Sequence, residues 1–225
     1  MMRNLLLLFG LQGVALLALT AATSDVPPPI SALAVPAVVV VVLVLLNGLF
    51  VAAEFSIVAV RPTQMEYRAE LGEHSAKQVL EVLQSPRRQD RYIATAQLGI
   101  TLASLGLGMY GEAEIASFIE PWLAHWLPFP IEEALLHTLG YIIAVSVLTY
   151  LHVVVGEMVP KSLALFNAEV AVLRLNTPMQ FMRFVLGIPV LVLNGIGRGL
   201  MHLLRVPLTT GHERVHSPEE IEHIV

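Results

Sequence analysis

Long apolar runs dominate this chain, and their lengths predict helices that cross a lipid bilayer. Over residues 32–60 the strongly polar side chains are one asparagine, one glutamate and one serine. Residues 92–110 carry no charge, and residues 134–156 carry two histidines and a few hydroxyl groups. Because about 20 apolar residues span a bilayer as an α-helix, the pattern predicts three transmembrane helices.

The composition agrees with a membrane protein. Of the 225 residues, 56% are hydrophobic and 14% are charged, with a mean hydropathy of +0.71, whereas about a quarter of the residues of a soluble domain are charged. The absence of cysteine excludes disulfides and thiolate metal sites. A net charge of −5 argues against nucleic acid as a partner. No paired catalytic carboxylates, activated nucleophile or HExxH motif is recognisable, so we expect no enzyme.

The first residues follow the order of a secretory signal. Arg3 precedes an apolar stretch over residues 5–19, then four small residues and a run of three prolines. Residues 1–24 are therefore expected to be a signal peptide or an extra N-terminal helix. In both cases the chain near Ser31 starts outside the membrane.

Charge asymmetry predicts the orientation in the plasma membrane. The segment between the first two runs contains six basic residues, whereas residues 111–133 contain no lysine or arginine. Because basic loops stay in the cytoplasm, the first span is expected to enter from outside, residues 111–133 to form an external loop, and the C-terminus to be cytoplasmic. Apolar residues spaced along one face of residues 62–85 predict a helix on the membrane surface; they are Met65, Leu71, Val79 and Leu83.

A fourth apolar segment is too short for a regular span. Residues 184–196 are interrupted by glycine, proline and asparagine, which predicts an interfacial or re-entrant helix pair. The expected fold class is thus an all-α membrane protein, with three transmembrane helices per subunit, juxtamembrane helices and a kinked third span.

Polar groups within the spans are candidates for function because they are costly in lipid. On the second span Gln97, Thr101 and Ser104 follow i, i+4, i+7 spacing and share a helical face. This face would either pack against another helix or line an ion path with oxygen atoms.

The end of the third span offers a more specific arrangement. Pro160 has no amide hydrogen for the carbonyl of Gly156, and Glu157 adds a carboxylate beside that carbonyl. A broken helix with these groups is a candidate cation site. The alternative is an interfacial salt bridge between Glu157 and Lys161, four residues apart.

Two further polar residues lie at membrane depth. Glu54 follows two alanines near the cytoplasmic end of the first span, where it would bind an ion or reach interfacial water. His152 is expected to hydrogen-bond within the bundle, because Mg²⁺ prefers oxygen ligands.

Three stretches together resemble the CNNM/CorC family, whose membrane domain is also called DUF21: NGLFVAAEFS from Asn47, QLGITLASLGLG from Gln97 and HVVVGEMVPKSLAL from His152. The resemblance covers residues 32–205. It implies a homodimeric magnesium and cobalt efflux protein, with three spans per subunit. It also implies that residues 206–225 lead into a cytoplasmic CBS pair that binds adenine nucleotide.

Carried over by position, the family's metal site falls on Glu54, Thr101, Ser104, Gly156 and Glu157. The chain departs from the family where hydroxyl residues precede the first-span glutamate, since it has Val51, Ala52 and Ala53 there, and where asparagines stand on the second span, since it has Ile100 and Ser104. We therefore expect a transporter that moves Mg²⁺ by alternating access. The alternative function is a membrane anchor or regulatory module for a cytoplasmic nucleotide-sensing domain. An intramembrane hydrolase is the weaker rival.

The predicted orientation can be checked by labelling, because the chain contains no native cysteine. In intact cells an impermeant thiol reagent should modify Ser117→Cys but not Ser75→Cys. Permeabilised cells, in which both cysteines are accessible, provide the control. Labelling of Ser75→Cys from outside would show that the protein has the opposite orientation in the membrane.

Overall fold

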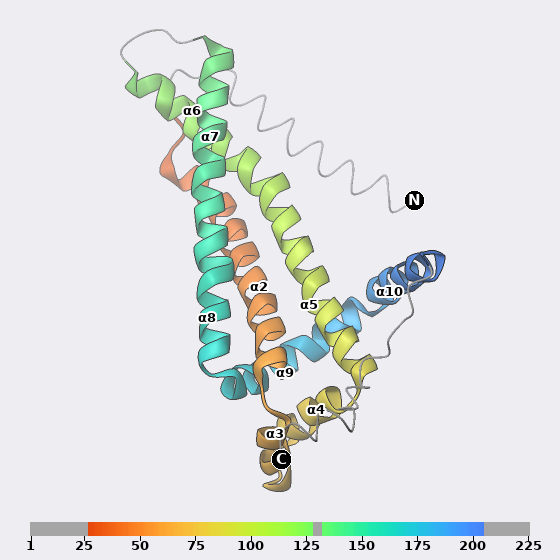
Figure 1. Ribbon diagram of the computed structural model, residues 1–225. Helices are drawn as coiled ribbons and strands as arrows, with labels where there is room; N and C mark the ends of the chain where they lie inside the picture. Colours follow the sequence, from red (N-terminus) through yellow and green to blue (C-terminus); the bar gives the residue numbers. More distant parts are fainter. Residues whose placement is uncertain (1–26, 128–131, 205–225) are drawn as a thin grey trace, which may run out of the picture. The chain divides into compact units, whose positions relative to one another are not determined.

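The computed structural model describes residues 27–127 and 132–204, which are almost entirely helical (Figure 1). The predicted signal segment 1–24 and the predicted linker 206–225 lie outside the described residues. The elements are η1 (Ile30–Leu33), α2 (Ala34–Ala59), α3 (Pro62–Glu70), α4 (His74–Leu83), α5 (Pro86–Gly106), η2 (Leu107–Gly111), α6 (Glu112–Trp126), α7 (Glu133–Leu151), η3 (His152–Met158), α8 (Val159–Phe166), α9 (Ala168–Val185) and α10 (Gly187–Leu203).

Three helical stretches are long and apolar enough to cross a membrane, which confirms the predicted number of spans. They are Ile30–Ala59, Pro86–Trp126 and Glu133–Phe166. The second stretch contains α5, the π-helical segment η2 and α6. The expectation of a loop is therefore wrong for residues 112–126, which form a helix; the external location of this segment stays a prediction. Glu112 and Glu114 lie in the first turn of α6, where acidic side chains favour a helix.

The apolar segment near the end of the chain forms the predicted helix pair. α9 and α10 meet at an angle of 73° around a short break, the geometry of a broken span or re-entrant loop. The break falls at Leu186, directly before Gly187. Asn194 and Gly195 lie within α10 and do not interrupt it. Of the residues expected to interrupt this segment, only Gly187 lies at the break.

The described residues form two compact units. One contains Met109–Leu148 with the chain up to Val40, and the other contains Val41–Gly108 with the chain from Thr149 onward. In the first unit α6 and α7 are joined by polar contacts. His137 Nδ1 lies 2.7 Å from a Glu120 carboxylate oxygen, and the Tyr141 hydroxyl donates to Glu112 at 3.2 Å.

In the second unit α2 and α5 lie side by side in opposite directions (Figure 1). Asn47 pairs with Ser104, and Glu54, two turns further along α2, pairs with Gln97, two turns earlier on α5. Between these pairs the ring of Phe50 packs against the backbone of Gly99. A glycine at this position is required because it lets the two helices approach closely.

The end of the third span runs parallel to α2. Asn47 contacts Gly156, and one residue further along α2 Gly48 contacts Pro160. A Cβ atom added to Gly48 would lie 2.9 Å from the Pro160 ring. Where a kink is predicted, the span contains the π-helical segment η3, which ends at Met158, two residues before Pro160.

The segment 62–85 is helical as predicted, but it forms two helices rather than one. Gly72 has a φ of 90°, a left-handed conformation that suits glycine and ends α3 before α4 begins. Met65 and Val79 enter the core of this unit, whereas Leu71 is exposed.

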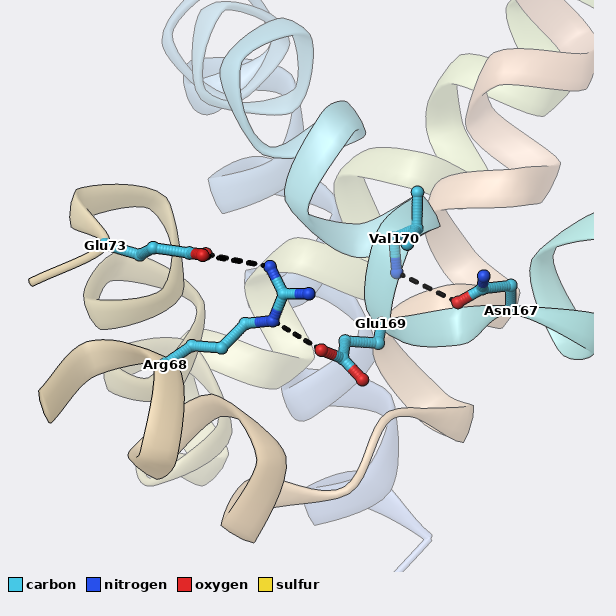
Figure 2. A network of polar contacts seen from close by, with 5 residues as sticks. All are labelled: Arg68, Glu73, Asn167, Glu169 and Val170. Carbon is cyan, nitrogen blue, oxygen red and sulfur yellow. Dashed lines mark hydrogen bonds and ion pairs between the residues drawn. The ribbon is translucent and has the colours of Figure 1, made fainter. Parts of the chain in front are cut away.

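A polar network fixes the start of α9 to the α3–α4 corner (Figure 2). The Arg68 guanidinium donates to Glu73 at 3.0 Å and to Glu169. Both carboxylates raise the pKa of Arg68, with the Glu73 hydrogen bond as the larger cause. The Asn167 side chain accepts from the Val170 amide at 3.3 Å and caps the N-terminus of α9.

The close contact of α2 and α5 can be tested at Gly99. A Cβ at this position would lie 2.5 Å from atoms of the buried Phe50 ring, so Gly99→Ala should destabilise the protein by about 1–3 kcal/mol. Gly195→Ala is the matched control, since nothing lies within 4 Å of its added Cβ. Melting temperatures in detergent should fall for the first variant only; equal values for both would contradict the packing described.

Candidate functional site

Asn47 is the centre of a polar contact network within the apolar helices. It lies in α2 with 1% of its surface exposed. Its amide Nδ2 donates to the Gly156 carbonyl at 2.9 Å, and its Oδ1 accepts from the Ser104 hydroxyl at a long 3.4 Å. One side chain of the first span thus bonds both the second and the third.

The third span is irregular at Gly156, the residue whose carbonyl accepts the Asn47 amide. Gly156 lies in the π-helical segment η3, and Pro160, four residues later, has no amide hydrogen to donate. A Cβ at Gly156 would lie 3.3 Å from both Asn47 Nδ2 and His152 Cδ2. A glycine at position 156 therefore lets the buried side-chain amide of Asn47 reach this backbone.

His152 completes the network from the third span. Its Nε2 lies 3.1 Å from the Ser104 hydroxyl, with the donor set by the imidazole tautomer. The expected hydrogen bond of this histidine within the bundle is thus present. Asn47, Ser104, His152 and the Gly156 carbonyl are referred to below as the Asn47 cluster.

A second polar pair lies two helical turns from the Asn47 cluster, about 10 Å along the helices. Gln97 Nε2 of α5 donates to the Glu54 carboxylate of α2 at 3.2 Å. Glu54 is half-buried and Gln97 is exposed. Near the predicted cytoplasmic end of the first span, a carboxylate is therefore held by an amide rather than by a basic residue.

The structure brings together some of the predicted site residues but not all of them. Ser104 and Gly156 meet through Asn47, while Glu54 belongs to the second pair. The Thr101 side chain is exposed, and its hydroxyl donates to the Gln97 carbonyl of its own helix at 2.9 Å. Glu157 follows Gly156 in η3 and is exposed. Their roles in metal binding stay predictions.

The salt bridge considered for Glu157 and Lys161 is not the arrangement observed. Within the described ranges 27–127 and 132–204, no ion pair joins these two residues. Lys161 Nζ instead lies 4.4 Å from the centre of the Phe55 ring, a cation–π distance. The carboxylate of Glu157 is therefore not neutralised by the lysine one turn away.

Sequence reasoning missed the role of Asn47. The signal was present, because Asn47 is the one amide side chain in the first apolar run, and an intramembrane polar residue is costly unless it is bonded. Its partners could not be named, since they depend on how three helices are rotated against one another.

The oxygen atoms gathered here have the chemistry that hard cations prefer: a carbonyl, an amide and a hydroxyl, with one carboxylate next in sequence. Among the residues that the structure describes, no group of three or more His, Asp or Glu side chains is arranged to hold a metal ion. Any cation at this position would depend mainly on neutral oxygen ligands.

Comparison with known proteins places these features in a family. The domain described as "Cyclin M transmembrane N-terminal domain" matches residues 38–225. UPF0053 protein YrkA of Bacillus subtilis (strain 168) is 35% identical over 187 residues, which cover 82% of this chain and 41% of the relative. UPF0053 protein YhdT of the same strain is 32% identical over 184 residues, covering 82% and 39%.

A more distant relative carries a functional name. The polyamine export protein of Salmonella typhimurium (strain 14028s / SGSC 2262) is 23% identical over 166 residues, covering 74% of this chain and 36% of the relative. The chain thus spans about two fifths of the length of the curated relatives it matches. With three helices long enough to span a bilayer and a family domain over most of its length, the chain is a multi-pass membrane protein that belongs to the CNNM family.

Proposed function

We propose that this chain is the membrane domain of a Mg²⁺ transporter that exports the ion across the plasma membrane. The observation that carries the proposal is the Asn47 cluster, in which oxygen atoms from all three spans meet beside an irregular helix segment. Such groups are expensive at membrane depth and mark ion pathways in membrane proteins. Family membership supports a transporter-type module.

Asn47 would change its partner when the ion binds. Its Nδ2 now donates to the Gly156 carbonyl, which blocks that oxygen. Rotation of the amide would release the carbonyl and turn Oδ1 toward the same place, so that two neutral oxygen ligands appear together. Ser104 would add a hydroxyl oxygen and Glu157 a negative charge. Since Mg²⁺ dehydrates reluctantly, several of its waters would remain.

The pair of Glu54 and Gln97 would be a second binding site on the path of the ion. It lies on the same two helices as Asn47 and Ser104, nearer the end of the first span that is predicted to be cytoplasmic. In an alternating-access cycle the ion would reach this pair from the cytoplasm and leave the Asn47 cluster toward the outside. The carboxylate of Glu54 supplies the charge for the first contact.

The predicted partners fit this proposal. Many large apolar side chains on α2, α7 and α10 are exposed, as expected of helices that face lipid or a second copy in a homodimer. A CBS pair that binds adenine nucleotide would belong to a region beyond this chain, which spans about two fifths of its relatives.

A second candidate function is export of a polyamine, which the name of the Salmonella relative suggests. Polyamines are multiply charged cations, but they need carboxylates spaced along an elongated path rather than oxygens gathered around one point. A third possibility is a membrane anchor or regulatory module for the remaining part of the protein. These three functions differ in what crosses the membrane.

Flux measurements distinguish the three functions. The purified protein is reconstituted into liposomes, and Mg²⁺ is followed with an indicator dye while spermidine is followed by radiolabel. We expect Mg²⁺ flux above that of empty liposomes, with excess spermidine having little effect. Spermidine flux without Mg²⁺ flux would support polyamine export, and no flux of either cation would support the anchor.

Glu157 should contribute charge to the ion site, whereas Lys161 should not. Glu157→Gln keeps the size but removes the charge, so Mg²⁺ flux should fall by about tenfold or more. Lys161→Gln is the matched control, because its ammonium lies on the Phe55 ring. Mg²⁺ flux and calorimetric titration check both variants. Equal, small effects of the two substitutions would exclude Glu157 from the site.

The Asn47 cluster also predicts a difference between two hydroxyl residues of the second span. Ser104→Ala removes a hydroxyl that contacts Asn47 and His152, so Mg²⁺ affinity should weaken by roughly tenfold. Thr101→Val removes a hydroxyl that bonds its own helix and should change affinity by less than about twofold. Calorimetric titration gives both affinities. A larger effect of Thr101→Val than of Ser104→Ala would show that Mg²⁺ binds beside Thr101 and not at the Asn47 cluster.

A further inference from the structure

Three arginines gather where the start of α5 packs against the end of α9. Arg88 and Arg91 lie in the first turns of α5, and Arg183 lies in the last turn of α9. Arg183 is close enough to both for their charges to act on it. The positive N-terminal end of the α5 dipole adds to the same field.

The described acidic residues pair with one of these three arginines and leave the other two without an ion pair. Arg88 pairs with Glu81 at 2.6 Å, but within residues 27–127 and 132–204 no ion pair includes Arg91 or Arg183. Asp90 lies between Arg88 and Arg91 in sequence and is exposed. Arg183 therefore stands in a field of like charge, although it is half-buried.

Buried hydrogen-bond donors in the same place lack an acceptor. Arg183 Nε and the Tyr92 hydroxyl are both fully buried, and neither has a hydrogen-bond partner in the described part of the chain. Tyr92 is 2% exposed and lies near Arg183. An unsatisfied buried donor is costly, so an acceptor that reaches these atoms when the surrounding side chains move would lower the free energy. Beside three arginines, a negatively charged acceptor suits best.

The surroundings indicate what kind of molecule carries that acceptor. Phe184 and Ile188, beside Arg183 at the bend between α9 and α10, have exposed fractions of 86% and 77%. Such side chains suit hydrocarbon rather than water. The nearby basic residues belong to the segment that the charge pattern predicts to be cytoplasmic. Cytoplasmic leaflets are rich in anionic lipids, and basic pockets between helices bind their head groups.

We propose that Arg183, together with Arg88 and Arg91, binds the phosphate group of an anionic phospholipid at the α5–α9 junction. The phosphate accepts hydrogen bonds from the guanidinium groups, and the acyl chains lie along Phe184 and Ile188. Arginine suits this role because its planar group donates two parallel hydrogen bonds to a phosphate. The lipid would hold the bent α9–α10 pair against the start of α5.

The binding test uses the purified protein in detergent with added phosphatidylglycerol or phosphatidylcholine. Native mass spectrometry counts the lipids retained, and melting temperature reports their effect on stability. The parent should retain phosphatidylglycerol in preference to phosphatidylcholine and melt at a higher temperature with it. Arg183→Gln should weaken phosphatidylglycerol binding by about fivefold.

Arg174→Gln is the matched control, because Arg174 is an exposed arginine on the same helix. It should bind phosphatidylglycerol like the parent. If Arg183→Gln does not fold, Arg91→Gln and Tyr92→Phe replace it. Tyr92→Phe should raise the melting temperature without lipid, since it removes an unsatisfied hydroxyl, and should reduce the increase that phosphatidylglycerol produces.

Three results would overturn the proposal. One is equal retention of phosphatidylglycerol by the parent and the variants at Arg183, Arg91 and Tyr92. Another is an equal loss in Arg174→Gln, which would indicate unspecific attraction of a basic surface. The third is displacement of the lipid by excess inorganic phosphate, which would assign the arginines to a soluble oxyanion instead.

Discussion

The arrangement of the spans depends on how one backbone carbonyl is satisfied in a medium without water. Within a bilayer each peptide group needs a partner from the protein, because lipid offers none. Pro160 removes an amide from the third span, and the Gly156 carbonyl accepts from Asn47 of the first span. This bond fixes the rotation and the depth of α2 against η3. Through Ser104 it also orients the second span.

Close approach of the helices complements that bond. Gly48 of α2 lies against Pro160, and Gly99 of α5 lies against Phe50 of α2. At each of these two contacts one of the helices has no side chain, so the backbones approach closely. In lipid the hydrophobic effect does not drive helices together, and contact area and buried polar bonds must do so. Outside the spans the chain uses other means: the network of Arg68, Glu73 and Glu169 joins α3, α4 and α9 through charge.

Hydropathy predicted the spans because it reports directly on the solvent that surrounds a helix. The sequence pattern did not predict the helix α6, because its acidic first turn and internal Pro121 resemble a loop, although both are compatible with a helix. The site was partly predictable. Spacing places Gln97, Thr101 and Ser104 on one face, but Thr101 lies about 60° around the helix from Ser104. Contact with α2 covers a narrower arc, so Gln97 and Ser104 reach it and Thr101 does not. Only the packed helices reveal that difference.

The contact of Phe50 with Gly99 has a consequence for water. It lies between the Asn47 cluster and the pair of Glu54 and Gln97, and the ring is 4% exposed. A phenyl ring packed against a glycine backbone leaves no room for water at that contact. Hydration of that interval requires α2 and α5 to separate. In the packed arrangement a dry contact, made by one aromatic side chain, therefore separates the two polar positions.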